Sequence, residues 1–169
     1  VCDGKLFPQV LILGDSHAAG AIGQTLQAEL LAAGLRTARQ AIIGSGIARW
    51  THEPLVAGPE TYPLVLLGTN DFTTPPGKVT ASAVLLMQRF GQKGIWLGPP
   101  PMTRADVVAH LSMLDQTLQE ATTRAGWVFV PLDGPERPGA DGVHFTGPAA
   151  RAIGKRAAAG VPRVVGEHR

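Results

Sequence analysis

The stretch "QVLILGDSHAAGAIGQTLQAELLAA", residues 9–33, decides the fold class. Residues 9–13 form a short apolar run, which is typical of a strand buried on both faces. Residues 18–33 place apolar side chains at helical spacing and stop at Gly34. Between them lies the polar turn of residues 14–17, "GDSH". A strand, a tight turn and a helix make up the first half of a βαβ unit.

The same alternation recurs to the end of the chain. We expect further strands at residues 38–43, 62–68, 94–98 and 127–132, a loop from the second strand to about residue 61, and helices at 78–91, 104–125 and 147–159. Short apolar strands that alternate with helices predict a parallel sheet covered on both faces. A chain of 169 residues suits one core. The expected fold is therefore one three-layer α/β/α domain over 1–169, with five parallel strands and a core of about 9–159.

Composition and charge exclude several classes of protein. Hydrophobic residues make up 44% and charged residues 17%, as in an ordinary globular chain. The net charge of +2 names no partner. Basic residues cluster only near the end, without interleaved aromatic residues, which indicates a solvated helix face and no nucleic-acid partner. This cluster comprises Arg151, Lys155, Arg156 and Arg163. No apolar run reaches the roughly 18 residues that span a bilayer.

The start of the chain carries two further observations. Cys2 is the single cysteine, so it has no internal disulfide partner, and its context does not resemble that of a nucleophile. The first residue is Val1 instead of methionine, which suggests a processed protein or a domain excised from a longer one. Neither observation indicates a particular cellular compartment.

Polar residues follow four of the five expected strands. They are residues 14–17 (GDSH), 44–46 (GSG), 68–71 (GTND) and 141–144 (DGVH). Parallel strands bring their carboxyl ends to one edge of a sheet, where loops and helix N-termini converge. We therefore expect all four groups to share one cleft.

Ser16 has two interpretations. Between a strand and a helix, a serine is most commonly an N-cap. A nucleophile needs a base and an orienting group, and Asp141 and His144 offer both. Three residues apart on a turn, the carboxylate can meet one imidazole nitrogen while the other faces Ser16. The alternatives are a capping aspartate with a surface histidine, or a metal pair, for which no third ligand lies at tight spacing.

An ester carbonyl that is attacked by a nucleophile becomes an oxyanion, which needs preorganised donors. The Ser16 amide at a helix N-terminus can supply one. A glycine of the GSG segment lets a second amide approach closely, and the Asn70 side chain can supply a third donor.

Together the four groups, in this order, resemble the SGNH hydrolases, the family of GDSL-type esterases and lipases. The resemblance covers about residues 9–159. It implies a flavodoxin-like fold and two-step acyl transfer without a metal or organic cofactor. It also implies Ser16 as nucleophile, His144 as general base and Asp141 as its orienter, with Ser16, Gly46 and Asn70 as oxyanion donors. Gly46 is preferred to Gly44 because the family's glycine often follows a small polar residue, here Ser45.

Three residues near these groups are candidate substrate contacts. His17 stands where the family's motif has leucine, and it is either a partly exposed helix-start residue or a contact to the substrate or the site loops. Arg49 and Trp50 lie in the 47–61 loop, whose polar and aromatic mixture suits a sugar. Trp50 fits a core anchor equally well.

The substrate follows less directly than the chemistry. A compact chain with few long insertions suits a small acyl group, and "GPPPM" at 98–102 resembles turns of bacterial SGNH proteins that act on envelope or capsule carbohydrate. We expect O-deacetylation of a carbohydrate, which favours a secreted or cell-envelope location. The alternatives are a short-chain lipid esterase, lysophospholipase or thioesterase, and, from other classes, an O-acyltransferase or a non-catalytic carbohydrate-binding module.

Overall fold

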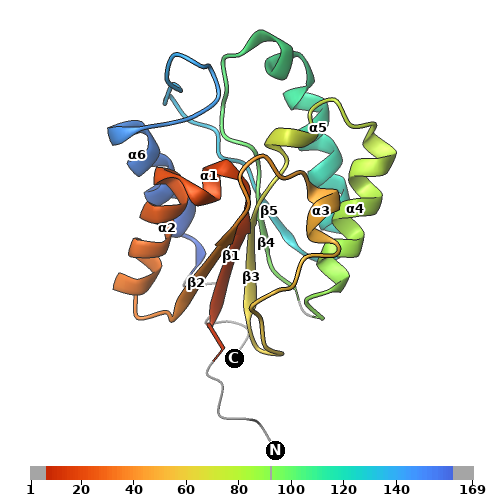
Figure 1. Cartoon of the computed structure of the whole chain (residues 1–169), viewed down its shortest axis with the longest axis vertical. Coiled ribbons are helices and arrows are strands. Elements are labelled where there is room, and N and C mark those ends of the chain that lie inside the picture. Colours follow the sequence, from red (N-terminus) through yellow and green to blue (C-terminus); the bar gives the residue numbers. More distant parts are fainter. Residues whose placement is uncertain (1–6, 92, 162–169) are drawn as a thin grey trace, which may run out of the picture.

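The computed structural model describes residues 7–91 and 93–161, and its centre is a single sheet of five parallel strands (Figure 1). The strands are β1 (Val10–Gly14), β2 (Thr37–Ala41), β3 (Tyr62–Leu66), β4 (Ile95–Leu97) and β5 (Val128–Val130). Their order across the sheet is β2-β1-β3-β4-β5, and every neighbouring pair is parallel. The predicted α/β fold with five parallel strands is confirmed.

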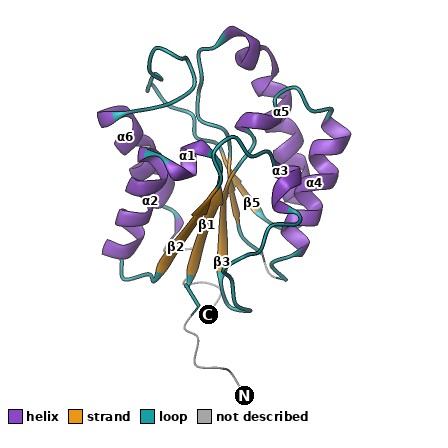
Figure 2. Cartoon of the chain, in the orientation of Figure 1, coloured by secondary structure: helices purple, strands orange, loops and turns teal. Residues whose placement is uncertain are grey.

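Helices cover both faces of the sheet (Figure 2). One face carries α1 (Ser16–Ala19), α2 (Ala21–Ala32) and α6 (Gly147–Ala158), and the other carries α3 (Ile47–Trp50), α4 (Pro76–Gln88) and α5 (Ala105–Arg124). Successive strand residues point to opposite faces. In β1, Val10 and Ile12 therefore pack under α2 and α6, whereas Leu11 and Leu13 pack under α3, α4 and α5. Burial on both faces is the reason that β1 has no polar residue.

The strand register places the loops of interest together. Gly14, at the end of β1, pairs with Ala41 of β2 and with Leu66 of β3. The three strands thus end at the same level, and the loops after them begin side by side. The strand order changes direction between β1 and β3, which is where ligands bind in open α/β sheets.

Two local features differ from the sequence-based expectation. The helix predicted over 18–33 is two helices, because Gly20 is extended (φ −82°, ψ −161°) and separates α1 from α2. The predicted loop up to about residue 61 contains the four-residue helix α3, and a 3₁₀ turn, η1 (Thr69–Asp71), follows β3. Elements of three or four residues are too short to show a hydrophobic period, so the pattern of apolar residues did not predict them.

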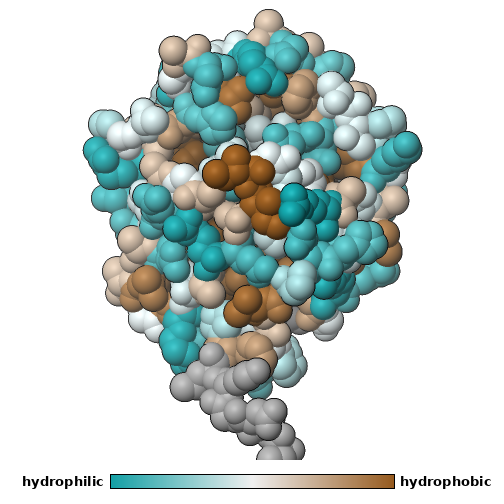
Figure 3. All heavy atoms as spheres, in the orientation of Figure 1, coloured by the Kyte–Doolittle hydropathy of each residue, from teal (hydrophilic) through white to brown (hydrophobic). Residues whose placement is uncertain are grey.

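The surface of the face drawn in Figure 3 is largely hydrophilic, with apolar atoms gathered near its middle, in front of the loops that follow the strands.

Among the basic residues of α6, Arg156 pairs with Glu136 at 2.7 Å and Lys155 lies 3.9 Å from Glu29. Cys2 and Arg163 lie outside the described residues. None of the helices within 7–91 and 93–161 is long and apolar enough to cross a membrane.

Candidate active site

The turn after β1 puts Ser16 at the carboxyl edge of the sheet. A Cβ atom on Gly14 would lie 2.3 Å from the Leu66 carbonyl oxygen and 2.5 Å from the Ala18 Cβ, so this turn needs glycine. Asp15 is the N-cap of α1, and its Oδ1 accepts a hydrogen bond from the His17 amide at 2.9 Å. Asp15 therefore has the capping position, and Ser16 is the first residue of the helix. The cap interpretation of Ser16 is thus wrong.

Ser16, His144 and Asp141 form one line of contacts. The Ser16 Oγ lies 3.0 Å from His144 Nε2, and His144 Nδ1 lies 2.6 Å from Asp141 Oδ2. Asp141 Oδ1 also accepts from the amides of Val143 and His144, each at 2.9 Å. Those two amide bonds, followed by the bond from the His144 ring, hold the pKa of Asp141 well below its usual range. The carboxylate is thus fixed in its charged form beside the imidazole.

The loop that carries Asp141 and His144 is fastened to the rest of the molecule by its backbone. The amides of Thr103 and Arg104 both donate to the Gly142 carbonyl, at 2.9 and 3.1 Å. Phe145 is buried and belongs to the core cluster on the α2 and α6 face. These contacts on both sides of the loop hold His144 next to Ser16, although the two residues are 128 positions apart in the sequence.

The 44–46 segment lies beside the 3₁₀ turn η1. Asn70 Nδ2 donates to the Ser45 carbonyl at 3.0 Å and lies 3.5 Å from Asp15 Oδ2. Within the described ranges, the amides of Ser16 and Gly46 donate to no acceptor, and the Gly44 amide shares this property. The two glycines differ in their contacts: Gly46 lies against Asp71, whereas the space around the α-carbon of Gly44 is open.

His17 is buried beside the line of contacts. Its side chain is 3% exposed, and its ring centroid lies 5.5 Å from that of His144 and 6.1 Å from that of Phe145. Its Nε2 atom is buried without a hydrogen-bond partner among the described residues. Burial, with a smaller contribution from the neighbouring His144, lowers the pKa of His17 to about 4. The expectation of a partly exposed residue is wrong, whereas the expected contact to a site loop is present.

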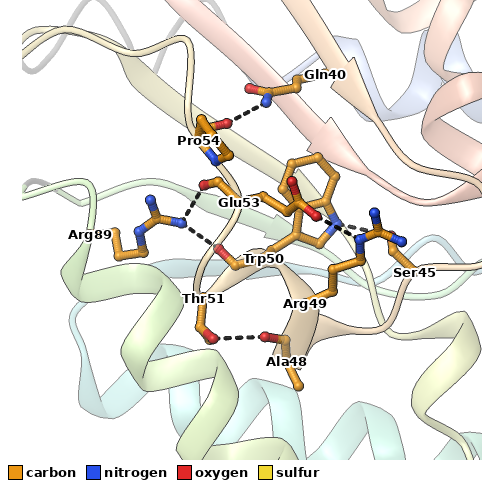
Figure 4. A network of polar contacts seen from close by, with 9 residues as sticks. All are labelled: Gln40, Ser45, Ala48, Arg49, Trp50, Thr51, Glu53, Pro54 and Arg89. Atoms are coloured by element: carbon orange, nitrogen blue, oxygen red, sulfur yellow. Dashed lines mark hydrogen bonds and ion pairs between the residues drawn. The ribbon is translucent and has the colours of Figure 1, made fainter.

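Trp50 is a core residue. It is 0% exposed and packs in the cluster on the α4 and α5 face, and its Nε1 donates to the Ser45 Oγ at 2.9 Å (Figure 4). Its carbonyl oxygen accepts from the Arg89 guanidinium at 2.6 Å. The expected substrate contact of Trp50 is therefore wrong, because no solvent reaches the ring. Arg49 is exposed and forms an ion pair with Glu53 at 2.7 Å.

Two buried carboxylates in these loops, Asp15 and Asp71, had no predicted role. Asp71 is 6% exposed and accepts from the Ile47 amide, at 3.0 Å to Oδ2 and 3.3 Å to Oδ1. Burial raises the pKa of Asp71 to about 6, against the lowering effect of that hydrogen bond. Burial also raises the pKa of Asp15 to about 7, and the negative charge of Asp71 adds to this rise. The only sequence signal was their position next to Ser16 and Asn70.

The arrangement can activate a hydroxyl and surround a developing negative charge with N–H donors. The residues within 7–91 and 93–161 include no group of three or more histidine, cysteine or acidic side chains arranged to hold a metal ion.

No family model matches this chain, and no curated protein sequence does. Solved structures share its fold. A carbohydrate acetylesterase family member from Sinorhizobium meliloti is 18% identical, with a TM-score of 0.73 over 93% of this chain and 99% of its own. An acetylxylan esterase from Geobacillus stearothermophilus is 16% identical, with a TM-score of 0.67 over 88% and 90%. The aryl esterase of M. smegmatis is 16% identical, with a TM-score of 0.67 over 88% and 95%.

Proposed function

We propose that this chain is a serine esterase of the SGNH type that hydrolyses small acyl esters through an acyl-enzyme, with O-acetyl groups on a carbohydrate as its substrate. The observation that carries the proposal is the line of contacts from Asp141 through His144 to Ser16, with distances of 2.6 and 3.0 Å. A carboxylate, an imidazole and a hydroxyl in this order can turn the hydroxyl into a nucleophile. The esterases that share the fold support the same chemistry.

Acylation begins with proton transfer. With its Nδ1 proton bonded to Asp141, His144 presents Nε2 as an acceptor to the Ser16 hydroxyl. As Nε2 takes the proton, the Ser16 oxygen attacks the ester carbonyl, and the carbonyl oxygen gains the negative charge. Asp141 stabilises the imidazolium that results. When the intermediate collapses, His144 returns the proton to the leaving alcohol, and the acyl group stays on Ser16.

Three donors would stabilise the oxyanion: the amides of Ser16 and Gly46 and the side chain of Asn70. Loss of one such donor typically costs about 10²- to 10³-fold in rate.

Deacylation repeats the steps with water as the nucleophile. His144 takes a proton from that water, and the Ser16 oxygen leaves with the proton that His144 returns. The products are the free acid and the starting enzyme, so the residues present suffice for turnover.

The openness of the site supports a small acyl group on a bulky alcohol. The side chains of His144 and Asp141 are 51% and 53% exposed, so a polymer can approach them. A cavity of about 560 Å³ lies elsewhere, between α4 and α5, where Val84, Met87 and Trp127 line it. A long acyl chain needs an extended apolar channel, and the lining of this cavity does not include Ser16, Asp141 or His144. A secreted or cell-envelope location would fit a carbohydrate substrate.

Hydrolysis of 4-nitrophenyl acetate tests the nucleophile. We expect S16A to abolish release of 4-nitrophenol, and S112A, which changes an exposed serine on α5, to match the wild type. When the acetyl-enzyme is trapped and digested to peptides, the acetyl group should be found on Ser16. Equal turnover by S16A and the wild type would refute the assignment.

The substrate is tested separately. Nitrophenyl esters from acetate to palmitate report the acyl preference, and acetate release from O-acetylated polysaccharides reports the alcohol part. We expect acetate to be preferred and polysaccharide acetate to be released. A preference for long acyl chains would refute the carbohydrate proposal, and transfer of acetate to an added sugar in place of water would identify an acyltransferase.

A further inference from the structure

Two consecutive residues of η1 hold the two sides of Gly46. The side-chain Nδ2 of Asn70 donates to the Ser45 carbonyl at 3.0 Å, just before Gly46. The Asp71 carboxylate accepts from the Ile47 amide at 3.0 and 3.3 Å, just after it. The peptide groups on both sides of Gly46 are therefore fixed by one short turn, which follows β3, whereas Gly46 itself follows β2.

Asp71 also touches Gly46 directly. A Cβ atom at position 46 would lie 2.8 Å from Asp71 Oδ1 and 3.3 Å from its Oδ2. The backbone of Gly46 is extended (φ −91°, ψ 174°), a conformation open to any residue, so the need for glycine comes from the carboxylate and not from the backbone angles. The aspartate and the glycine thus fit each other as a pair.

A buried carboxylate is costly unless hydrogen bonds compensate for the lost water. At 6% exposure, Asp71 is nearly removed from solvent, and the Ile47 amide is the one donor that its carboxylate meets within the described residues. Burial raises the pKa of Asp71 to about 6, which reflects this incomplete compensation. A side chain kept at such a cost next to an oxyanion donor indicates a functional contribution.

We propose that Asp71 is a positioning residue for the oxyanion site: by holding the Ile47 amide and the α-carbon of Gly46, its carboxylate sets the direction of the Gly46 amide. This inference rests on the proposed esterase function. Asp71 does not touch the substrate and acts only through the backbone of residues 46 and 47. Its removal should weaken stabilisation of the transition state and leave binding of the ester unchanged.

The first test is a comparison of kcat and KM for 4-nitrophenyl acetate. We expect D71A to lower kcat by about 10- to 100-fold with KM within about threefold, because one oxyanion donor loses its alignment. D71N keeps an oxygen that can accept from the Ile47 amide, so it should recover most of the rate. D115N is the control, because Asp115 is a partly buried carboxyl group whose pKa burial raises to about 6, and it lies on α5 and not against Gly46.

A double-mutant cycle with G46A separates positioning from general damage. The new methyl group would displace the carboxylate, so G46A should show the same loss of kcat, and G46A combined with D71A should be little worse than either variant alone. If D71A does not fold, D71L, which fills the space without an acceptor, replaces it in the cycle.

Two results would overturn the proposal: an unchanged kcat in the Asp71 variant, or losses that multiply in the double variant. Inactivity of the wild type would instead refute the esterase function itself. The two failures are therefore distinguishable in one set of assays.

Discussion

Burial of the His17 imidazole should make the free energy of unfolding depend on pH. In the unfolded chain a histidine titrates near pH 6.5, whereas burial lowers the pKa of folded His17 to about 4. Between these values the unfolded state binds a proton that the folded state does not, so the free energy of unfolding falls as the pH falls. At about pH 4.5 the loss amounts to about 2 kcal/mol, and it is nearly absent at about pH 7.

H17L removes this contribution by replacing the buried imidazole with an apolar side chain. Urea unfolding, followed by the fluorescence of the buried tryptophans, gives the free energy of unfolding of both proteins at the two pH values. We expect the stability of H17L relative to the wild type to rise by about 2 kcal/mol on acidification from about pH 7 to about pH 4.5. Shifts of Asp15 and Asp71 affect both proteins alike and cancel in the difference.

The control is H52L, which makes the same histidine-to-leucine change at an exposed position and reports any general effect of that change. A difference between H17L and the wild type that is the same at both pH values would refute the reasoning. It would mean that folded His17 accepts a proton readily and that water reaches its ring.

Three further variants test other contacts. D141N should lower kcat for 4-nitrophenyl acetate by at least about 100-fold with little change in KM, because an amide stabilises the His144 imidazolium poorly. G14A should lower the free energy of unfolding by more than about 2 kcal/mol, as seen in urea, because its Cβ would lie 2.3 Å from the Leu66 carbonyl oxygen. W50F removes the donor to the Ser45 hydroxyl and should lower the free energy of unfolding by about 1–2 kcal/mol. An unchanged unfolding midpoint would contradict either stability prediction.

The centre of the sheet was predictable because its inner strands, β1, β3 and β4, are buried on both faces. Such strands appear in the sequence as short apolar runs, and the runs of β1 and β3 are fully buried in the structure. Once the strands are parallel, the topology alone brings their carboxyl ends together. Ser16, Asn70 and His144 could therefore be assigned to one site without knowledge of any contact.

Local sequence patterns did not predict the contacts of Trp50, Asp71 and His17. Trp50 suited a sugar contact and a core anchor equally well, and the choice depends on packing with the cluster on the α4 and α5 face. Asp71 meets the Ile47 amide 24 positions away, and no local pattern signals that bond. His17 has the same limitation, because its burial is completed by Phe145 and His144 from the far end of the chain.

Burial of polar residues concentrates at the proposed site. Of the seven buried polar or charged residues among those described, five lie in its loops: Asp15, His17, Ser45, Thr69 and Asp71. Burial moves the pKa of all three titratable members towards the neutral form, upward for the two carboxyl groups and downward for the imidazole. A fold selected for stability alone would place apolar side chains there, as it does throughout β1. The polar residues therefore reduce stability where the site needs fixed donors, and apolar replacements at these positions should stabilise the chain while they slow its reaction.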